Sequence, residues 1–176
     1  ALTGLLSSGI IVLILMTPAI LQKSYGIDAA TALSANSLST VFLSIGCILA
    51  GLTVDRIGGA RFFMFFSPLL AISAFILFMT LRVDPSWLFV LSALVGLCVG
   101  TIGAVPHAMV HAFPAAVRFS GLSASYNLAY AVFGGLTPIA VTVMQQVSPL
   151  APAFYVLLFS IVGVITGFAL RGQQKL

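Results

Sequence analysis

The chain has 176 residues, of which 61% are hydrophobic and only 6% are charged. Soluble domains carry roughly 25% charged residues, so this composition excludes an ordinary soluble domain and predicts an integral membrane protein. The formal net charge is +4, but the seven basic residues are scattered singly. Because they form no cluster that could follow a phosphate backbone, nucleic acid is excluded as a partner.

Six apolar segments, separated by charged or Pro- and Gly-bearing breaks, predict an all-α polytopic protein with six transmembrane helices in one bundle. The predicted segments are 3–21, 33–54, 60–81, 86–107, 119–145 and 151–170. Cys47 and Cys98 both lie inside apolar segments, where free cysteine behaves as a small hydrophobe, so no disulfide framework is expected. The chain begins at Ala1 with neither Met nor a basic leader, and we expect it to be a piece of a longer protein.

Basic residues are distributed unevenly between the two sides of the predicted bundle. Alternate breaks lie on the same side of the membrane, which places Lys23 and Arg82 on one side. The other side collects Arg56, Arg61, Arg118, Arg171 and Lys175. Five basic residues against two predict that the richer side, and with it both termini, is cytoplasmic.

Three of the segments carry local features that concern packing. Pro18 follows Thr17 in the first segment and predicts a bend, because proline removes a backbone donor. One face of the second segment is small and weakly polar (Ser37, Thr40, Ser44, Cys47 and Gly51). Such a face favours tight helix contact over lining a pathway. In the fourth segment, Gly96, Gly100 and Gly103 form a seam that lets another backbone approach closely.

The fifth segment carries a polar stripe on an otherwise apolar helix. With about 100° per residue, its members fall within one narrow arc, opposite Leu128 and Val132. They are Ser123, Tyr126, Asn127, Tyr130, Gly134 and Thr137. Lipid cannot satisfy amide, hydroxyl and phenol groups, so the stripe must face another helix or water inside a protein.

No carboxylate lies inside any of the six segments. Asp28, Asp55 and Asp84 all lie in breaks, so a proton relay within the membrane would have to use His107 or groups outside this chain. His107 and His111 are four residues apart, but no third ligand is nearby, and we expect no metal site. The sequence also lacks a nucleophile–base–orienter set and a Gly-rich phosphate loop, so we expect neither an enzyme nor a cofactor.

The break between the second and third segments, GLTVDRIGGAR from residue 51 to residue 61, resembles the signature loop of the major facilitator superfamily, GxxxDRxGR[RK]. In that family the loop joins the second and third helices of each six-helix half and helps to latch the cytoplasmic side. The resemblance implies a gating set of Gly51, Asp55, Arg56, Gly58, Arg61 and, in the next loop on that side, Arg118. Asp55 is expected to face a helix N-terminus, where an anion is favoured by about 0.3–1 kcal/mol. Gly59 departs from the pattern, since the family has a basic residue at this position. The alternative to a gating role is that the charged residues of the loop only set the membrane topology.

The two stretches FPAAVRFSGLSASYNLAYAVFGG (residues 113–135) and APAFYVLLFSIVGVITGFALR (residues 151–171) resemble the last two helices of the metabolite:proton symporter branch of this superfamily, and most of all its proline/betaine transporters. The match covers the C-terminal six of the family's twelve helices. It implies a multi-pass protein of the bacterial inner membrane, with two inverted three-helix repeats, that moves a small polar solute by alternating access with protons as the coupling ion. Ser123, Tyr126, Asn127, Tyr130 and Thr137 would line the substrate cavity.

Half a transporter has no opposing wall, so the resemblance implies either a missing N-terminal half or a second copy in a homodimer. We expect the chain alone to be inactive. The alternative is a non-transporting membrane scaffold or assembly half, in which the polar stripe only packs helices. A pore is disfavoured because no selectivity filter or charged ring is recognisable.

Overall fold

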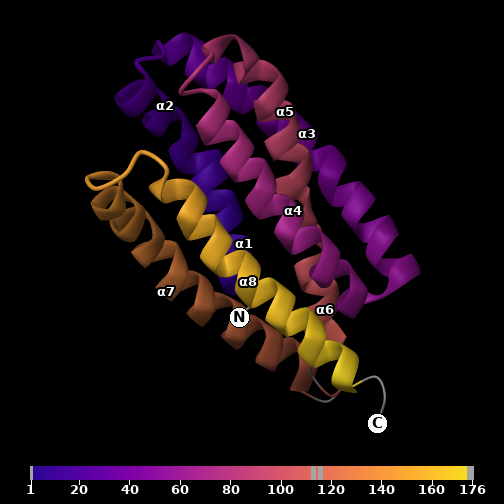
Figure 1. Cartoon of the computed structure of the whole chain (residues 1–176). Helices are drawn as coiled ribbons and strands as arrows, with labels where there is room; N and C mark the ends of the chain where they lie inside the picture. Colours follow the sequence, from indigo (N-terminus) through magenta and orange to yellow (C-terminus); the bar gives the residue numbers. More distant parts are fainter. Residues whose placement is uncertain (1, 112–113, 115–116, 174–176) are drawn as a thin grey trace.

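The computed structural model describes residues 2–111, 114 and 117–173, and these form six helical spans without a β-strand (Figure 1). The predicted all-α, six-span fold is confirmed. The first span comprises α1 (Leu2–Ile10), η1 (Ile11–Met16) and α2 (Thr17–Tyr25), and the second and third are α3 (Ala29–Ile57) and α4 (Gly59–Thr80). The fourth comprises η2 (Pro85–Trp87), α5 (Leu88–Val99), η3 (Gly100–Ala104) and α6 (Val105–His111). The last two are α7 (Arg118–Gln145) and α8 (Ala151–Gln173).

Helix ends explain why α3 begins at Ala29, four residues before the apolar segment predicted from the sequence. Asp28 is the N-cap, and its carboxylate accepts a hydrogen bond of 2.9 Å from the backbone N–H of Thr31. Hydrogen bonds from the side chain and then the backbone of Thr31 lower the pKa of Asp28. Hydropathy does not detect such a cap, because the first turn after it is made of small and polar residues.

A wide π-helical turn precedes Pro18, where the sequence predicts a bend. Residues Ile11–Met16 adopt this turn directly before Thr17 and Pro18. Since Pro18 has no N–H to donate, the backbone register changes here, and the Thr17 hydroxyl donates to the Val12 carbonyl at 3.0 Å. Residues 11–14, Thr17 and Pro18 are buried, Met16 is half-buried and Leu15 is exposed.

The glycine seam of the fourth span packs against α3, as expected. A Cβ atom on Gly96 would overlap the backbone of Ser39, and one on Gly100 would overlap the backbone of Gly46. The hydroxyl of Ser39 also donates to the carbonyl of Ser92 across this contact. The two backbones therefore touch, which only glycine allows.

The tight helix contact expected of the polar face of α3 is not made by most of that face within the described residues. Ser37, Thr40 and Ser44 are exposed, and each hydroxyl donates to the carbonyl four residues earlier at 2.9–3.2 Å. Cys47 does touch Gly103. The buried face is instead the neighbouring one, made mainly of Ala32, Ala35, Ser39, Gly46, Ala50 and Val54. α3 therefore has two faces made of small residues. The face with the hydroxyls can remain exposed because each hydroxyl bonds to the backbone of its own helix.

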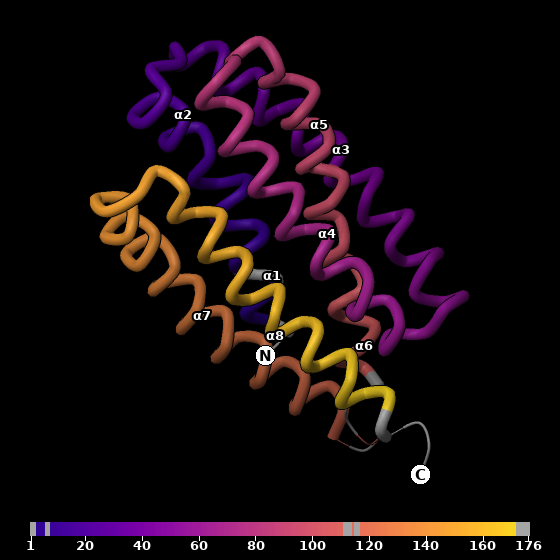
Figure 2. The backbone as a smooth tube through the Cα atoms, in the orientation of Figure 1, coloured from indigo at the N-terminus to yellow at the C-terminus, as the bar shows by residue number. Residues whose placement is uncertain are grey.

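The remaining spans wrap around the first span and α4. α4 packs along α8, and α7 packs against α1, η1 and α8. Figure 2 shows α3 at one edge of the bundle and α7 at the opposite edge. Phe62, Phe63 and Phe78 of α4 are fully buried in the centre, whereas Phe65 is 69% exposed. α4 is thus a packing helix on one side and an apolar surface on the other.

Candidate solute-binding face

α7 is the least buried of the six spans. Only 11% of its most apolar stretch is buried inside the chain, against 67% for the fourth span. Among its residues, Thr137 and Val141 alone are buried. A helix long and apolar enough to cross a membrane therefore presents most of its surface to the outside of this bundle. Its polar stripe is covered in part, because Asn127 is exposed, Thr137 is buried and the other members are half-buried.

Asn127 and Ser123 form the polar pair of the stripe. Asn127 is exposed, and its Nδ2 atom donates to the Ser123 carbonyl at 2.9 Å and to the Ser123 hydroxyl at 3.3 Å. The two residues are one helical turn apart, so the bonds are local. They fix the amide orientation, with Nδ2 turned toward the start of α7.

Tyr126 and Tyr130 form the aromatic part of the stripe. Their rings stack with centroids 5.7 Å apart and planes inclined by 14°. Both side chains are half-buried, with part of each ring packed against the core of the bundle. Gly134 lies one turn further along, where a Cβ atom would come within 3.5 Å of the Tyr130 ring. The structure therefore brings a polar pair and an aromatic pair together over two turns of α7.

Thr137 is placed apart from these four residues. It is buried, its hydroxyl lies 2.8 Å from the Tyr155 hydroxyl of α8, and it also bonds to the Phe133 carbonyl. Phe133 packs edge-on against Phe159 of α8, with ring centroids 5.4 Å apart. Thr137 thus belongs to the contact that fastens α7 to α8, and not to the exposed part of the stripe.

The residues of the signature loop lie at one end of the bundle. Gly51 and Asp55 are in the last two turns of α3, and Arg56 is exposed beside them. Gly58 has φ +81°, a conformation that favours glycine, and it ends α3 directly before α4 begins. Arg61 is exposed in the first turn of α4.

The structure brings Asp55 next to an imidazole, a contact that the sequence analysis does not predict. His107 Nδ1 lies 3.5 Å from Asp55 Oδ1, with 34% of the His107 side chain and 69% of the Asp55 side chain exposed. The pair joins the end of α3 to α6. Sequence reasoning missed it because the two residues are far apart in the chain, although the shared membrane side of the two breaks was a usable signal.

All six residues of the expected gating set lie within the described part of the chain. Arg118 is the exposed first residue of α7. Of the loop before it, Phe113 lies outside the described residues, as does Lys175 near the C-terminus, and the side chain of His111 is not described either. Within the described part, no three His, Cys, Asp or Glu residues gather as a metal site would require.

Known transporters are similar to this chain. The ectoine/proline transporter ProP of Corynebacterium glutamicum is 28% identical over 165 residues, covering 90% of this chain and 32% of the transporter. A putative proline/betaine transporter of Staphylococcus aureus is 29% identical over 155 residues, covering 84% and 33%. The proline/betaine transporter of Escherichia coli K12 is 31% identical over 128 residues, covering 69% and 25%. No protein-family model and no solved structure matches.

These similarities extend over most of the chain, and the relatives are transporters and not enzymes. The chain spans about a third of the length of the relatives it matches. Its six apolar helices agree with one half of the two-half transporter architecture. The chain therefore belongs to the major facilitator superfamily, as a match to the C-terminal half of transporters related to the proline/betaine group.

Proposed function

We propose that this chain is the C-terminal half of a secondary active transporter for a small polar solute, most fittingly a zwitterion of the proline or betaine type. The observation that carries the proposal is the polar group on α7, in which the exposed Asn127 and the half-buried Ser123, Tyr126 and Tyr130 stand together on a membrane-crossing helix. Hydrocarbon leaves such groups unsatisfied, so they belong at a wet or protein-lined surface.

The chemistry of this group suits a zwitterion. The tyrosine hydroxyls and the Asn127 amide can donate to a carboxylate. The faces of the stacked tyrosines attract a quaternary or secondary ammonium, an interaction of about 0.5–2 kcal/mol depending on desolvation. The names of the relatives, an ectoine/proline transporter and proline/betaine transporters, point to the same solute class.

Transport in this proposal proceeds by alternating access between this half and a second one. α7 would supply one wall of the cavity, and Thr137 would hold that wall against α8 through Tyr155. The opposing half is either the N-terminal half of a longer protein or a second copy of the chain. The exposed hydroxyls of α3 provide a further polar surface toward such a partner.

Proton coupling, if this half contributes to it, would involve the cytoplasmic end. Asp28, Asp55 and Asp84 all lie at helix ends or between helices. His107 and Asp55 are in contact at the end of α3, and in this proposal Gly51, Arg56, Gly58, Arg61 and Arg118 surround the two as the gating region. We place the protein in the bacterial inner membrane with both termini in the cytoplasm, following the arginine distribution.

Uptake tests this proposal. The chain would be reconstituted in vesicles alone and as a hybrid in which it follows the first half of the C. glutamicum transporter, and uptake of radiolabelled proline and betaine would be measured. We expect no uptake by the chain alone and uptake by the hybrid. Asn127→Leu should abolish hybrid uptake without reducing membrane insertion, whereas Val132→Leu, on the opposite side of α7, should leave uptake intact.

The competing function is a scaffold in which the stripe only packs helices. The observation that favours it is that Tyr126 and Tyr130 already pack partly on the core of this chain. A hybrid that inserts and is monodisperse yet shows no uptake, or an Asn127→Leu hybrid with normal uptake, would favour the scaffold and contradict the cavity.

A further inference from the structure

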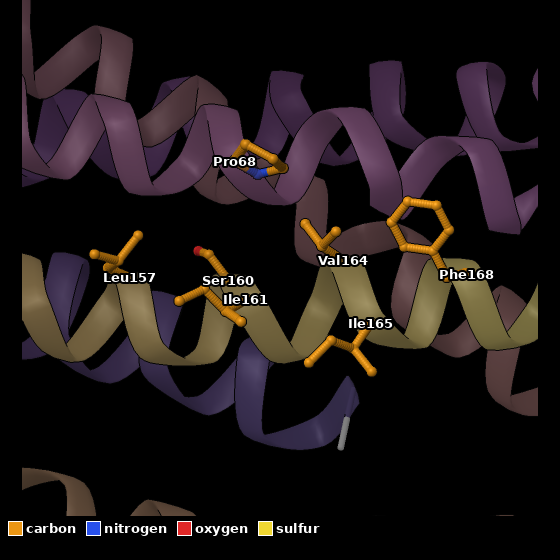
Figure 3. Close-up of a pocket in the computed structure, with 7 residues that line it drawn as sticks. All are labelled: Pro68, Leu157, Ser160, Ile161, Val164, Ile165 and Phe168. Atoms are coloured by element: carbon orange, nitrogen blue, oxygen red, sulfur yellow. The ribbon is translucent and has the colours of Figure 1, made fainter.

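A groove runs along the outer side of the contact between α4 and α8. Its volume is about 220 Å³, and its lining consists of Pro68, Leu157, Ser160, Ile161, Val164, Ile165 and Phe168. All of these residues except Ser160 are apolar. Figure 3 shows Pro68 on one helix and the other six residues along the facing helix. The groove thus lies on helices other than α3 and α7, which carry the proposed transport surfaces.

Two glycines explain why a groove forms beside this contact. A Cβ atom on Gly163 would lie 2.5 Å from the Ser67 hydroxyl, and one on Gly167 would lie 2.9 Å from the Ala60 carbonyl. The helices therefore meet closely along one line. Beside that line, larger side chains of α8 diverge from Pro68, and Ile161, Ile165 and Phe168 are 49%, 61% and 56% exposed. The groove is open toward the side where lipid would lie.

On each of the two helices, an arginine lies beyond the groove on the same helix face. On α4, Arg61 precedes Pro68 by seven residues, and on α8, Arg171 follows Val164 by seven residues. Residues seven apart lie on the same helix face, so both arginines extend the walls of the groove. Gly167 of α8 lies against Ala60 and Met64 of α4, so the antiparallel helices bring Arg61 and Arg171 to the same end. Both arginines are exposed.

The spacing agrees with the depth of one membrane leaflet. At a rise of about 1.5 Å per residue, the part of the groove from Phe168 to Ser160 lies roughly 5–17 Å from Arg171 along the helix axis. One leaflet contributes about half of a hydrocarbon core that is about 30 Å thick. An apolar chain in the groove would therefore begin about where the arginines meet the headgroups.

The arginine end also suits a phosphate. Arginine binds phosphate through paired N–H donors, and basic sites between membrane helices attract anionic headgroups. The N-cap of α4 is Gly58, which offers no side chain to bond the first N–H groups of the helix. Those N–H groups, next to Arg61, favour an anion at the same place.

We propose that the groove between α4 and α8, together with Arg61 and Arg171, binds one anionic phospholipid, with an acyl chain in the groove and the phosphate between the arginines. The site goes beyond the proposed transport function and does not rest on it. Neither the apolar groove nor the arginine pair requires the missing half.

Native mass spectrometry of the purified, delipidated chain tests the site. Phosphatidylglycerol and phosphatidylcholine with identical acyl chains would be titrated in parallel. We expect tighter binding of phosphatidylglycerol, and a loss of about fivefold in its affinity for each arginine changed to glutamine, since one basic residue near a membrane surface contributes about that factor. Arg61→Lys and Arg171→Lys should retain most of the preference, while Arg82→Gln, at the other end of α4, should change nothing.

The groove is tested independently with two tryptophan variants. Ile161→Trp, which fills the groove, should weaken both lipids by about tenfold, whereas Leu158→Trp, on an exposed position of α8 outside the groove lining, should not. Circular dichroism would verify that each variant keeps its helix content. Equal affinity of the wild-type chain for the two lipids, an effect of Arg82→Gln as large as that of the Arg61/Arg171 pair, or equal effects of the two tryptophans would each overturn the proposal.

Discussion

Two regions of the molecule carry stripes of small or polar residues, and the two stripes lie in different environments. One stripe lies in the contact of α3 with α5 and η3, and the other is the polar stripe of α7. In the first, Gly96 and Gly100 let two backbones touch, and the space for any Cβ atom is gone. In the second, Ser123, Asn127 and the two tyrosines stand on a helix whose most apolar stretch is only 11% buried. The glycine stripe is packed inside this chain, whereas the polar stripe of α7 is covered only in part and its Asn127 stays exposed.

Side-chain size explains the difference. Glycine removes the group that keeps helices apart, so a glycine seam closes on whichever backbone faces it, and the attraction comes from many close contacts. Tyrosine and asparagine cannot approach a backbone in this way, and their polar atoms need partners that an apolar neighbour does not offer. Small residues therefore predict an internal contact, and large polar residues predict a surface that is completed by solute, water or another protein segment.

The contrast between the two stripes would fail if the glycine seam of the fourth span tolerated a large side chain. We expect Gly100→Leu to destabilise the bundle by more than about 3 kcal/mol or to prevent folding, because the added atoms would overlap the backbone at Gly46. Gly135→Leu, on α7, has no atom within 4 Å of the added Cβ and should shift stability by less than about 1 kcal/mol. Thermal unfolding in detergent, followed by circular dichroism, measures both. Similar losses for the two variants would show that α7 is as tightly packed as the seam.

The role of the stacked tyrosines of α7 can be tested with betaine as the solute. In the hybrid transporter, Tyr130→Ala should weaken betaine binding about tenfold, because it removes one of two stacked ring faces from the cation, and tenfold is about 1.4 kcal/mol. Tyr130→Phe keeps the ring and should change betaine affinity by less than about threefold, a limit that corresponds to a single neutral hydrogen bond. Competition for uptake gives the affinities. If the Phe variant is as impaired as the Ala variant, the ring face is not the part that binds the solute.

Substitutions at Thr137 test whether this buried residue of α7 serves packing against α8 or solute binding. Thr137→Val should cost about 1 kcal/mol of stability, since it leaves the Tyr155 hydroxyl without this bond, and it should leave solute affinity unchanged. The double variant with Tyr155→Phe should cost less than the sum of the two single changes. Additive costs would mean that the hydroxyl pair contributes nothing, and a change in solute affinity would return Thr137 to the cavity wall.

Periodicity and hydropathy were enough to predict six helices and the polar stripe, because both depend on residues close in sequence. They could not predict which side of α3 faces the fourth span. Ser37, Thr40 and Ser44 satisfy their own hydroxyls through the backbone, so either face could have been buried. The burial of Thr137 and the pairing of His107 with Asp55 were also missed, since each depends on a residue of another helix.

The central claim, that the polar stripe of α7 lines a solute cavity, is tested most directly by thiol labelling of the hybrid. In a background with Cys47→Ala and Cys98→Ala, Asn127→Cys and Val132→Cys would be exposed to a membrane-impermeant thiol reagent with and without proline or betaine. We predict that position 127 reacts, that solute slows its reaction, and that position 132, on the opposite side of the helix, does not react. A position 127 that fails to react, or that reacts at a rate indifferent to solute, would contradict the claim.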